Sequence, residues 1–123
     1  MNDRELLELA AKAAGMHIDD WNCDMPVMYF WDGDPQNPER NHYYWSPLTD
    51  DGDALRLAVK LDIEIYQGDD EGPTVCAGYW GKPERRDVAR MYCIEPLAGD
   101  PCAATRRAIV RAAASIGEQL CRT

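Results

Sequence analysis

The chain has 123 residues, of which 46% are hydrophobic and 28% charged, and its formal net charge is −9. This length fits one domain over residues 1–123, and this balance of side chains is that of a globular protein rather than a disordered one. No apolar run approaches the ~20 residues that cross a bilayer, and the first residues lack the pattern of a secretory signal, so we expect a cytoplasmic protein.

The charge is divided unevenly along the chain. Residues 1–81 carry 5 basic and 17 acidic side chains, a net of −12, whereas residues 82–123 carry 8 basic and 5 acidic side chains, a net of +3. The overall negative field disfavours direct binding of nucleic acid, which depends on neutralising phosphates. An acidic surface suits a protein partner with a basic patch, and the unequal halves allow two copies to associate as a homodimer.

The first predicted element is a helix over residues 3–14. Asn2 and Glu5 have the spacing of a capping box, in which each side chain satisfies a free backbone N–H of the first turn. Gly15 follows at the position where a left-handed residue ends a helix. One apolar stripe is formed by Leu6, Leu9, Ala10 and Ala13.

Residues 16–48 are predicted to be irregular, apart from a short β-prone run from Val27 to Trp31. The next residues, 32–37, place oxygen ligands at alternate positions, but the spacing of an EF-hand is missing and a turn explains them better. A long loop over residues 32–48 is rich in prolines and aromatic rings, which indicates that it packs against something.

A second helix is predicted from Thr49 or Asp50, either of which can cap it, to Leu61. We expect its buried side to contain Leu55, Ala58, Val59 and Leu61. Three strands then follow at residues 63–65, 74–80 and 88–94. Their short connections predict an antiparallel meander.

The last predicted helix begins after Asp100, with Pro101 at its first position, and runs to Leu120. Its expected inner face consists of Cys102, Ile109, Val110, Ala113, Ile116 and Leu120. Helices packed on a small sheet make a stable layered domain. The sequence therefore predicts an α+β fold with a small, mainly antiparallel sheet of about three strands and a long C-terminal helix.

Three stretches resemble the phage ABA sandwich domain, a family of small phage and prophage proteins. Residues 6–15 resemble its opening helix and glycine-containing turn. Residues 45–50, followed by Ala54, Leu55 and Val59, resemble its proline-containing segment that leads into a capped helix, and residues 104–114 resemble its alanine-rich closing helix. The resemblance implies a three-layer α/β/α sandwich and a phage or prophage origin, and it implies no activity.

No catalytic, cofactor-binding or metal-binding motif is visible. The chain has no P-loop, no G-x-S-x-G and no H-E-x-x-H, so we do not expect an enzyme or a bound cofactor. The cysteines match no zinc spacing. We expect them to be free, buried or half-buried thiols: Cys23, Cys76, Cys93, Cys102 and Cys121.

An aromatic group is the first candidate binding site. It contains Trp31, His42, Tyr43, Tyr44 and Trp45, and such side chains make good anchors for a partner protein. For Trp45, a position in the core and a position on the surface are equally expected. Because neighbouring side chains of an extended segment point in opposite directions, we expect at least one of Tyr43 and Tyr44 to be exposed.

A group of basic residues is the second candidate. Arg85, Arg86, Arg106 and Arg107 are the predicted anion-binding residues, with Lys82, Arg90 and Arg111 nearby. Together they would bind a phosphorylated or cyclic-nucleotide ligand. Ion pairing with Glu84, Asp87 and Glu118 is the more ordinary interpretation.

These observations favour a non-catalytic phage accessory protein that binds and inhibits a host protein, with a component of antiviral defence as the expected target, in the cytoplasm of the host bacterium. Two alternatives stay open. One is a protein that sequesters a small phosphorylated signal, and the other is a component of the virion or of its assembly.

Overall fold

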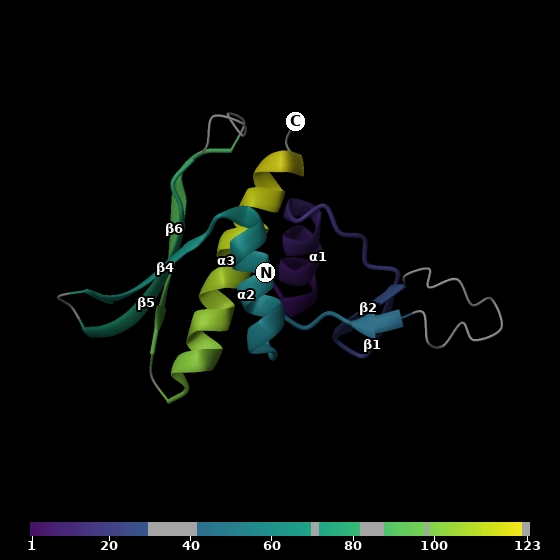
Figure 1. Ribbon diagram of the computed structural model, residues 1–123, viewed down its shortest axis with the longest axis horizontal. Helices are drawn as coiled ribbons and strands as arrows, with labels where there is room; N and C mark the ends of the chain where they lie inside the picture. The colour runs from purple at the N-terminus through teal and green to yellow at the C-terminus, as the bar shows by residue number, and fades with distance from the viewer. Residues whose placement is uncertain (30–41, 70–71, 82–87, 98, 122–123) are drawn as a thin grey trace.

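The structure is a computed structural model, and it describes residues 1–29, 42–69, 72–81, 88–97 and 99–121. Three helices and two antiparallel sheets make up the described part of the chain (Figure 1). In chain order the elements are α1 (Asp3–Ala13), β1 (Asp20–Asn22), β2 (Met25–Tyr29), β3 (His42–Tyr44), α2 (Asp51–Leu61), β4 (Glu64–Asp69), β5 (Gly72–Tyr79), β6 (Met91–Pro96) and α3 (Pro101–Cys121). The α+β class and the long C-terminal helix are confirmed.

The helix starts are set by local capping, as predicted. The side-chain oxygen of Asn2 accepts a hydrogen bond of 2.9 Å from the backbone N–H of Glu5, and the cap of α2 is Asp50, which accepts from the backbone N–H of Asp53 at 2.8 Å. Each of these bonds satisfies a donor that the helix itself leaves free. Helix α2 ends at Leu61 and is followed by the C-cap residue Asp62, whose φ of 57° lies in the left-handed region.

The predicted inner face of α2 was partly wrong. Leu55 and Val59 are 59% and 69% exposed. The buried stripe consists of Ala54, Leu57, Ala58 and Leu61. Because successive helical residues are rotated by about 100°, Leu55 and Val59 lie one step around the helix from this stripe. They form a separate apolar ridge on the surface.

Helix α3 lies between α1 and the larger sheet (Figure 1). Ile109 and Ala113 are buried, as expected, and the side chain of Arg107 is 42% exposed. Cys102 is exposed, contrary to the prediction. It shares the stripe of Ile109, but it lies in the first turn of α3, where it lines an open hollow together with Leu55 of α2.

The larger sheet has the strand order β4-β5-β6, and both pairs are antiparallel. The predicted meander is therefore confirmed, although β6 begins at Met91 rather than at Val88. Val75, Ala77 and Tyr79 of β5 are buried on the face toward the helices. All three helices lie on this side of the sheet in Figure 1. The layer order of the described residues thus differs from that of an α/β/α sandwich.

The smaller sheet, β1-β2-β3, lies on the other side of the helices (Figure 1). It was not predicted, because residues 16–48 were expected to be irregular apart from one β-prone run. A tight turn joins β1 to β2, and Cys23 adopts a φ of 57° there, a conformation that non-glycine residues seldom adopt. Strand β3, which follows residues 30–41 in the sequence, pairs with β2.

No helix in the described ranges is both long enough and apolar enough to cross a membrane.

Candidate functional site

The structure separates the members of the predicted aromatic group. Tyr43 and Tyr44 are 42% and 46% exposed, so the prediction that at least one is exposed is confirmed. His42 is half-buried and makes edge-to-face contacts with the rings of Tyr29 and Tyr44, with centroids 6.1 and 6.0 Å away. Trp31 lies outside the described residues.

Trp45 belongs to the core and is not available as a surface anchor, because only 4% of it is exposed. It lies directly after β3, and its backbone N–H donates a hydrogen bond to Pro26 at 3.0 Å. Side chains two apart in an extended segment share a face. Trp45 therefore follows Tyr43 toward the helices, and the two residues line one hollow together with Leu57 of α2.

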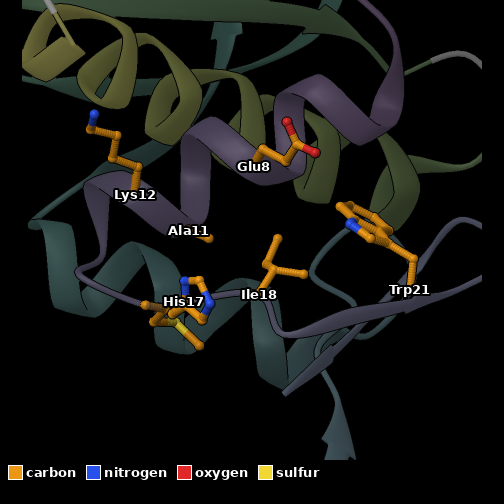
Figure 2. Close-up of a pocket in the computed structure, with 7 residues that line it drawn as sticks. Glu8, Ala11, Lys12, His17, Ile18 and Trp21 are labelled. Carbon is orange, nitrogen blue, oxygen red and sulfur yellow. The ribbon is translucent and has the colours of Figure 1, made fainter. Parts of the chain in front are cut away.

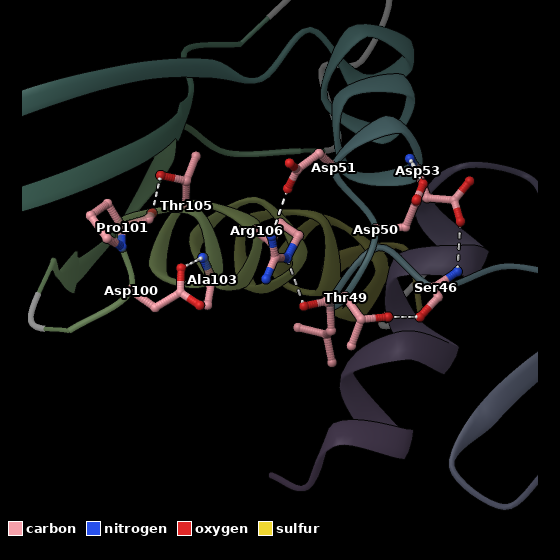
Figure 3. A network of polar contacts seen from close by, with 11 residues as sticks. Ser46, Thr49, Asp50, Asp51, Asp53, Asp100, Pro101, Ala103, Thr105 and Arg106 are labelled. Atoms are coloured by element: carbon pink, nitrogen blue, oxygen red, sulfur yellow. Dashed lines mark hydrogen bonds and ion pairs between the residues drawn. The ribbon is translucent and has the colours of Figure 1, made fainter.

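The predicted arginine patch is not formed by its described members. Arg106 donates to the backbone oxygen of Leu48 at 2.9 Å and to Asp51 at 2.6 Å (Figure 3). Arg107 pairs with Asp3 at 3.1 Å. Each guanidinium thus has its own anionic partner within the chain, as the ion-pairing interpretation expects, although neither carboxylate was predicted as the partner. Arg85 and Arg86 lie outside the described residues.

Arg111 is engaged in the same way. It donates to the carboxylate of Glu95 at 2.7 Å, and this hydrogen bond raises the pKa of Arg111 above its usual value. The carboxylate comes from β6, so the pair joins α3 to the sheet. The three described arginines of α3 are therefore tied to α1, α2 and β6 rather than gathered for an external anion.

The outer face of the larger sheet, on the side away from the helices, carries a set of exposed apolar side chains. Between 39% and 59% of each of these residues is exposed. We call this set the outer sheet face, and it consists of Tyr66, Trp80, Tyr92 and Ile94. The register explains the grouping, because Tyr66 pairs with Cys76 and Cys76 with Ile94, and directly paired residues share a face.

The ring of Trp80 is held in a fixed position on this face. Its indole N–H donates a hydrogen bond of 2.7 Å to Glu64. It also lies directly over Gly78, since a Cβ at that position would stand 2.9 Å from the ring carbon Cζ2. The ring of Tyr66 is nearly parallel to it, at 22° and with 6.3 Å between centroids. Glycine at position 78 is what leaves room for this ring.

Tyr66 is held as a neutral hydroxyl. A hydrogen bond with Cys76, reinforced by loss of hydration, raises the pKa of Tyr66 to about 12. Tyr66 therefore stays neutral at physiological pH, and the carboxylate of Glu64 lies at the edge of the outer sheet face. Such a surface is suited to binding rather than to proton transfer.

A groove of about 510 Å³ lies between α2 and β4, next to the outer sheet face. We call it the α2–β4 groove. Its apolar lining includes the exposed Leu55, Val59 and Ile65, and Trp80 lies where the groove meets the outer sheet face. The charged residues that line it are Asp62 and Glu64.

A second hollow, of about 440 Å³, lies beside α1 (Figure 2). Glu8 and Lys12 come from α1 and point away from His17, whose side chain is 87% exposed. The ring of Trp21 is covered by the guanidinium of Arg4 at 4.4 Å. These polar groups do not converge on a common point, so the hollow shows no catalytic arrangement.

Within the described ranges, no three histidine, cysteine or acidic side chains are grouped so that they could hold a metal ion. All five cysteines are free. Cys76 is buried and Cys93 half-buried, but the prediction of buried or half-buried thiols is wrong for the other three, Cys23, Cys102 and Cys121, which are exposed.

Comparisons of the chain with protein-family models, with curated proteins and with solved structures find no significant match.

The outer sheet face was missed by the sequence reasoning, although part of its signal was visible. The alternation of β6 predicts that Tyr92 and Ile94 share one face, opposite Met91 and Cys93, and the structure has them so. The alternation does not show that helices cover only one side of the sheet. The sequence analysis therefore named none of the four residues of the outer sheet face as a candidate site.

Proposed function

We propose that this protein is a non-catalytic accessory protein that binds another protein through the outer sheet face. The observation that carries the proposal is the exposure of Tyr66, Trp80, Tyr92 and Ile94 on one side of a sheet. Contiguous exposed apolar surface with a polar edge is typical of a protein interface. Aromatic rings that are already fixed, as Trp80 is by Glu64 and Gly78, lose little entropy on binding and make strong anchors.

The proposed partner is a protein of a host bacterium, and the proposed effect is inhibition of a host factor in antiviral defence, within the cytoplasm. Support comes from the resemblance of residues 6–15, 45–50 and 104–114 to the phage ABA sandwich domain. The formal charge of −9 adds support, since it suits a partner with a basic surface. Phage origin and the family itself are part of this proposal.

The test is capture of bacterial proteins by the tagged full-length chain, quantified by mass spectrometry. The outer-face variant carries Tyr92→Ser and Ile94→Ser, and the matched control carries Tyr29→Ser and Tyr44→Ser on the smaller sheet. All four positions are between 43% and 59% exposed, so both variants should keep the melting temperature of the wild type. We expect the outer-face variant to lose the captured partner and the control to retain it.

The opposite pattern, with loss only in the control, would move the interface to the aromatic group predicted from the sequence. Equal retention by both variants would exclude both sheets as the interface. If the wild-type chain retains no protein above background, the proposed function itself is wrong.

A further inference from the structure

We propose that the α2–β4 groove and the free edge of β4 together bind an extended segment of the partner, one that alternates apolar residues with lysine or arginine. The segment would add a strand to the larger sheet. This inference rests on the proposed function and specifies how the partner is recognised.

The free edge of β4 is the first observation. In the described part of the chain, β4 pairs with β5 alone and lies at the end of the strand order. The side chains from Glu64 to Gln67 are all exposed. An edge strand has backbone N–H and C=O groups that can pair with an added strand, and many proteins recognise extended peptides in this way.

The apolar ridge of α2 is the second observation. Leu55 and Val59 are four residues apart on one side of the helix and are the most exposed apolar side chains of that helix. Together with Ile65 they line the groove that runs beside the edge strand. An added strand would direct alternate side chains to its two faces. One set would meet the groove, and the other would extend the outer sheet face beside Tyr66.

Charge decides between partners for this groove. Its charged lining residues, Asp62 and Glu64, are both acidic, and no basic residue lines it in the described part of the chain. The hydrogen bond to Glu64 comes from the neutral indole of Trp80, which leaves the negative charge in place. Basic residues in the partner segment would therefore be attracted.

The same charge argues against a second copy of this chain as the occupant. Two β4 strands paired edge to edge would bring together two grooves whose charged lining residues, Asp62 and Glu64, are acidic in both copies. Like charges placed opposite each other destabilise a strand pair, and charged residues at a sheet edge are a common protection against self-pairing.

The experiment uses a displayed library of random linear peptides and the full-length protein. We expect the enriched peptides to alternate apolar residues with lysine or arginine. Their dissociation constants should rise by about tenfold or more for Val59→Lys, which blocks the groove and offsets one of its two negative charges. Position 59 is 69% exposed, so the variant should fold normally. The matched control is Tyr29→Lys on the smaller sheet, which should bind as the wild type does.

Backbone pairing has its own measurement. Hydrogen exchange followed by NMR should show that a bound peptide protects amides of β4 that exchange freely without it. The inference is overturned if no peptide is enriched, if the enriched peptides lack basic residues, if Val59→Lys binds them equally well, or if the β4 amides gain no protection.

The two proposals fail in different ways. If bacterial partners are captured equally by the wild type and by Val59→Lys, the groove is not the recognition site, while the proposed function stands. If the wild type captures no partner, the proposed function fails, whatever the peptides do.

Discussion

Gly117 in α3 faces the backbone of Leu9 in α1 with no space for a side chain between them. A Cβ at position 117 would collide with the carbonyl oxygen of Leu9 and would stand 2.8 Å from its carbonyl carbon. Because the obstacle is backbone, a rotamer change cannot relieve it. We expect Gly117→Ala to lower the free energy of unfolding by about 1–3 kcal/mol, the usual cost of overpacking, as measured by urea denaturation.

Gly52 supplies the matched control for this prediction. It also lies in a helix, but a Cβ there would meet only the ends of side chains, the guanidinium of Arg56 and the carboxylate oxygen of Asp50, each at 3.2 Å. Gly52→Ala should therefore leave stability unchanged or raise it by up to about 1 kcal/mol through better helix propensity. Equal effects of the two substitutions would show that α1 and α3 do not meet at Gly117 as described.

Tyr79 is 1% exposed, and its hydroxyl has no hydrogen-bond partner in the described part of the chain. A buried hydroxyl without a partner carries a desolvation cost of about 1–3 kcal/mol. We expect Tyr79→Phe to keep the packing of the ring and to raise the melting temperature. A clear fall in the melting temperature would mean that the hydroxyl has a partner, and Tyr79→Leu, which removes the ring, should be destabilising in either case.

Arg106 and Arg107 are neighbours in α3 with different surroundings. The side chain of Arg106 is 15% exposed and ties Leu48 and Asp51 to the helix, whereas that of Arg107 is 42% exposed in its pair with Asp3. Loss of a half-buried charged donor should cost about 1–3 kcal/mol, and loss of an exposed pair about 0–1 kcal/mol. Chemical denaturation of Arg106→Met and Arg107→Met should show this order, and the reverse order would contradict it.

The helices were predictable because their signals are local. Asn2, Asp50 and Asp100 each accept a hydrogen bond from a backbone N–H three residues later, and that spacing can be read directly from the sequence. The face that α2 buries was less predictable. It is set by what the helix packs against, and that information is not contained in the periodicity of the helix.

Contacts between distant residues account for the rest of what was missed. The smaller sheet depends on pairing Tyr29 with His42 across residues 30–41, and its strands are too short to show alternation. Arg107 finds Asp3 at a separation of 104 residues. No local pattern names such partners, so the sequence left the arginines open between anion binding and ion pairing, and it did not show which face of the larger sheet is uncovered.

The five thiols should fall into two classes of reactivity. Cys23, Cys102 and Cys121 are exposed and should be alkylated quickly at neutral pH, whereas Cys76 is buried and Cys93 half-buried. Burial raises the pKa of Cys93, which lowers the fraction of reactive thiolate. Peptide mapping after timed alkylation of the folded protein should find Cys93 modified late and faster as the pH rises. Early labelling of Cys93 would contradict its placement, and denatured protein should label at all five positions.

Tyr66 allows the outer sheet face to be tested by titration. Its hydrogen bond with Cys76 and its loss of hydration raise its pKa to about 12 from an ordinary value of 10.0. Since the folded-state pKa lies above the unfolded one, the neutral hydroxyl is favoured by folding. The resulting contribution to stability is fully present below about pH 10 and is lost as the pH rises through about 12.

The measurement for Tyr66 is the ultraviolet absorbance change of tyrosine ionisation, compared between the wild type and Tyr66→Phe. The difference between the two titration curves should have its midpoint near pH 12, provided that circular dichroism shows the protein still folded there. Tyr92→Phe removes a tyrosine from the same face and should leave that late component in place. A difference curve centred near pH 10 would mean that the Tyr66 hydroxyl is free in solvent and makes no hydrogen bond with Cys76.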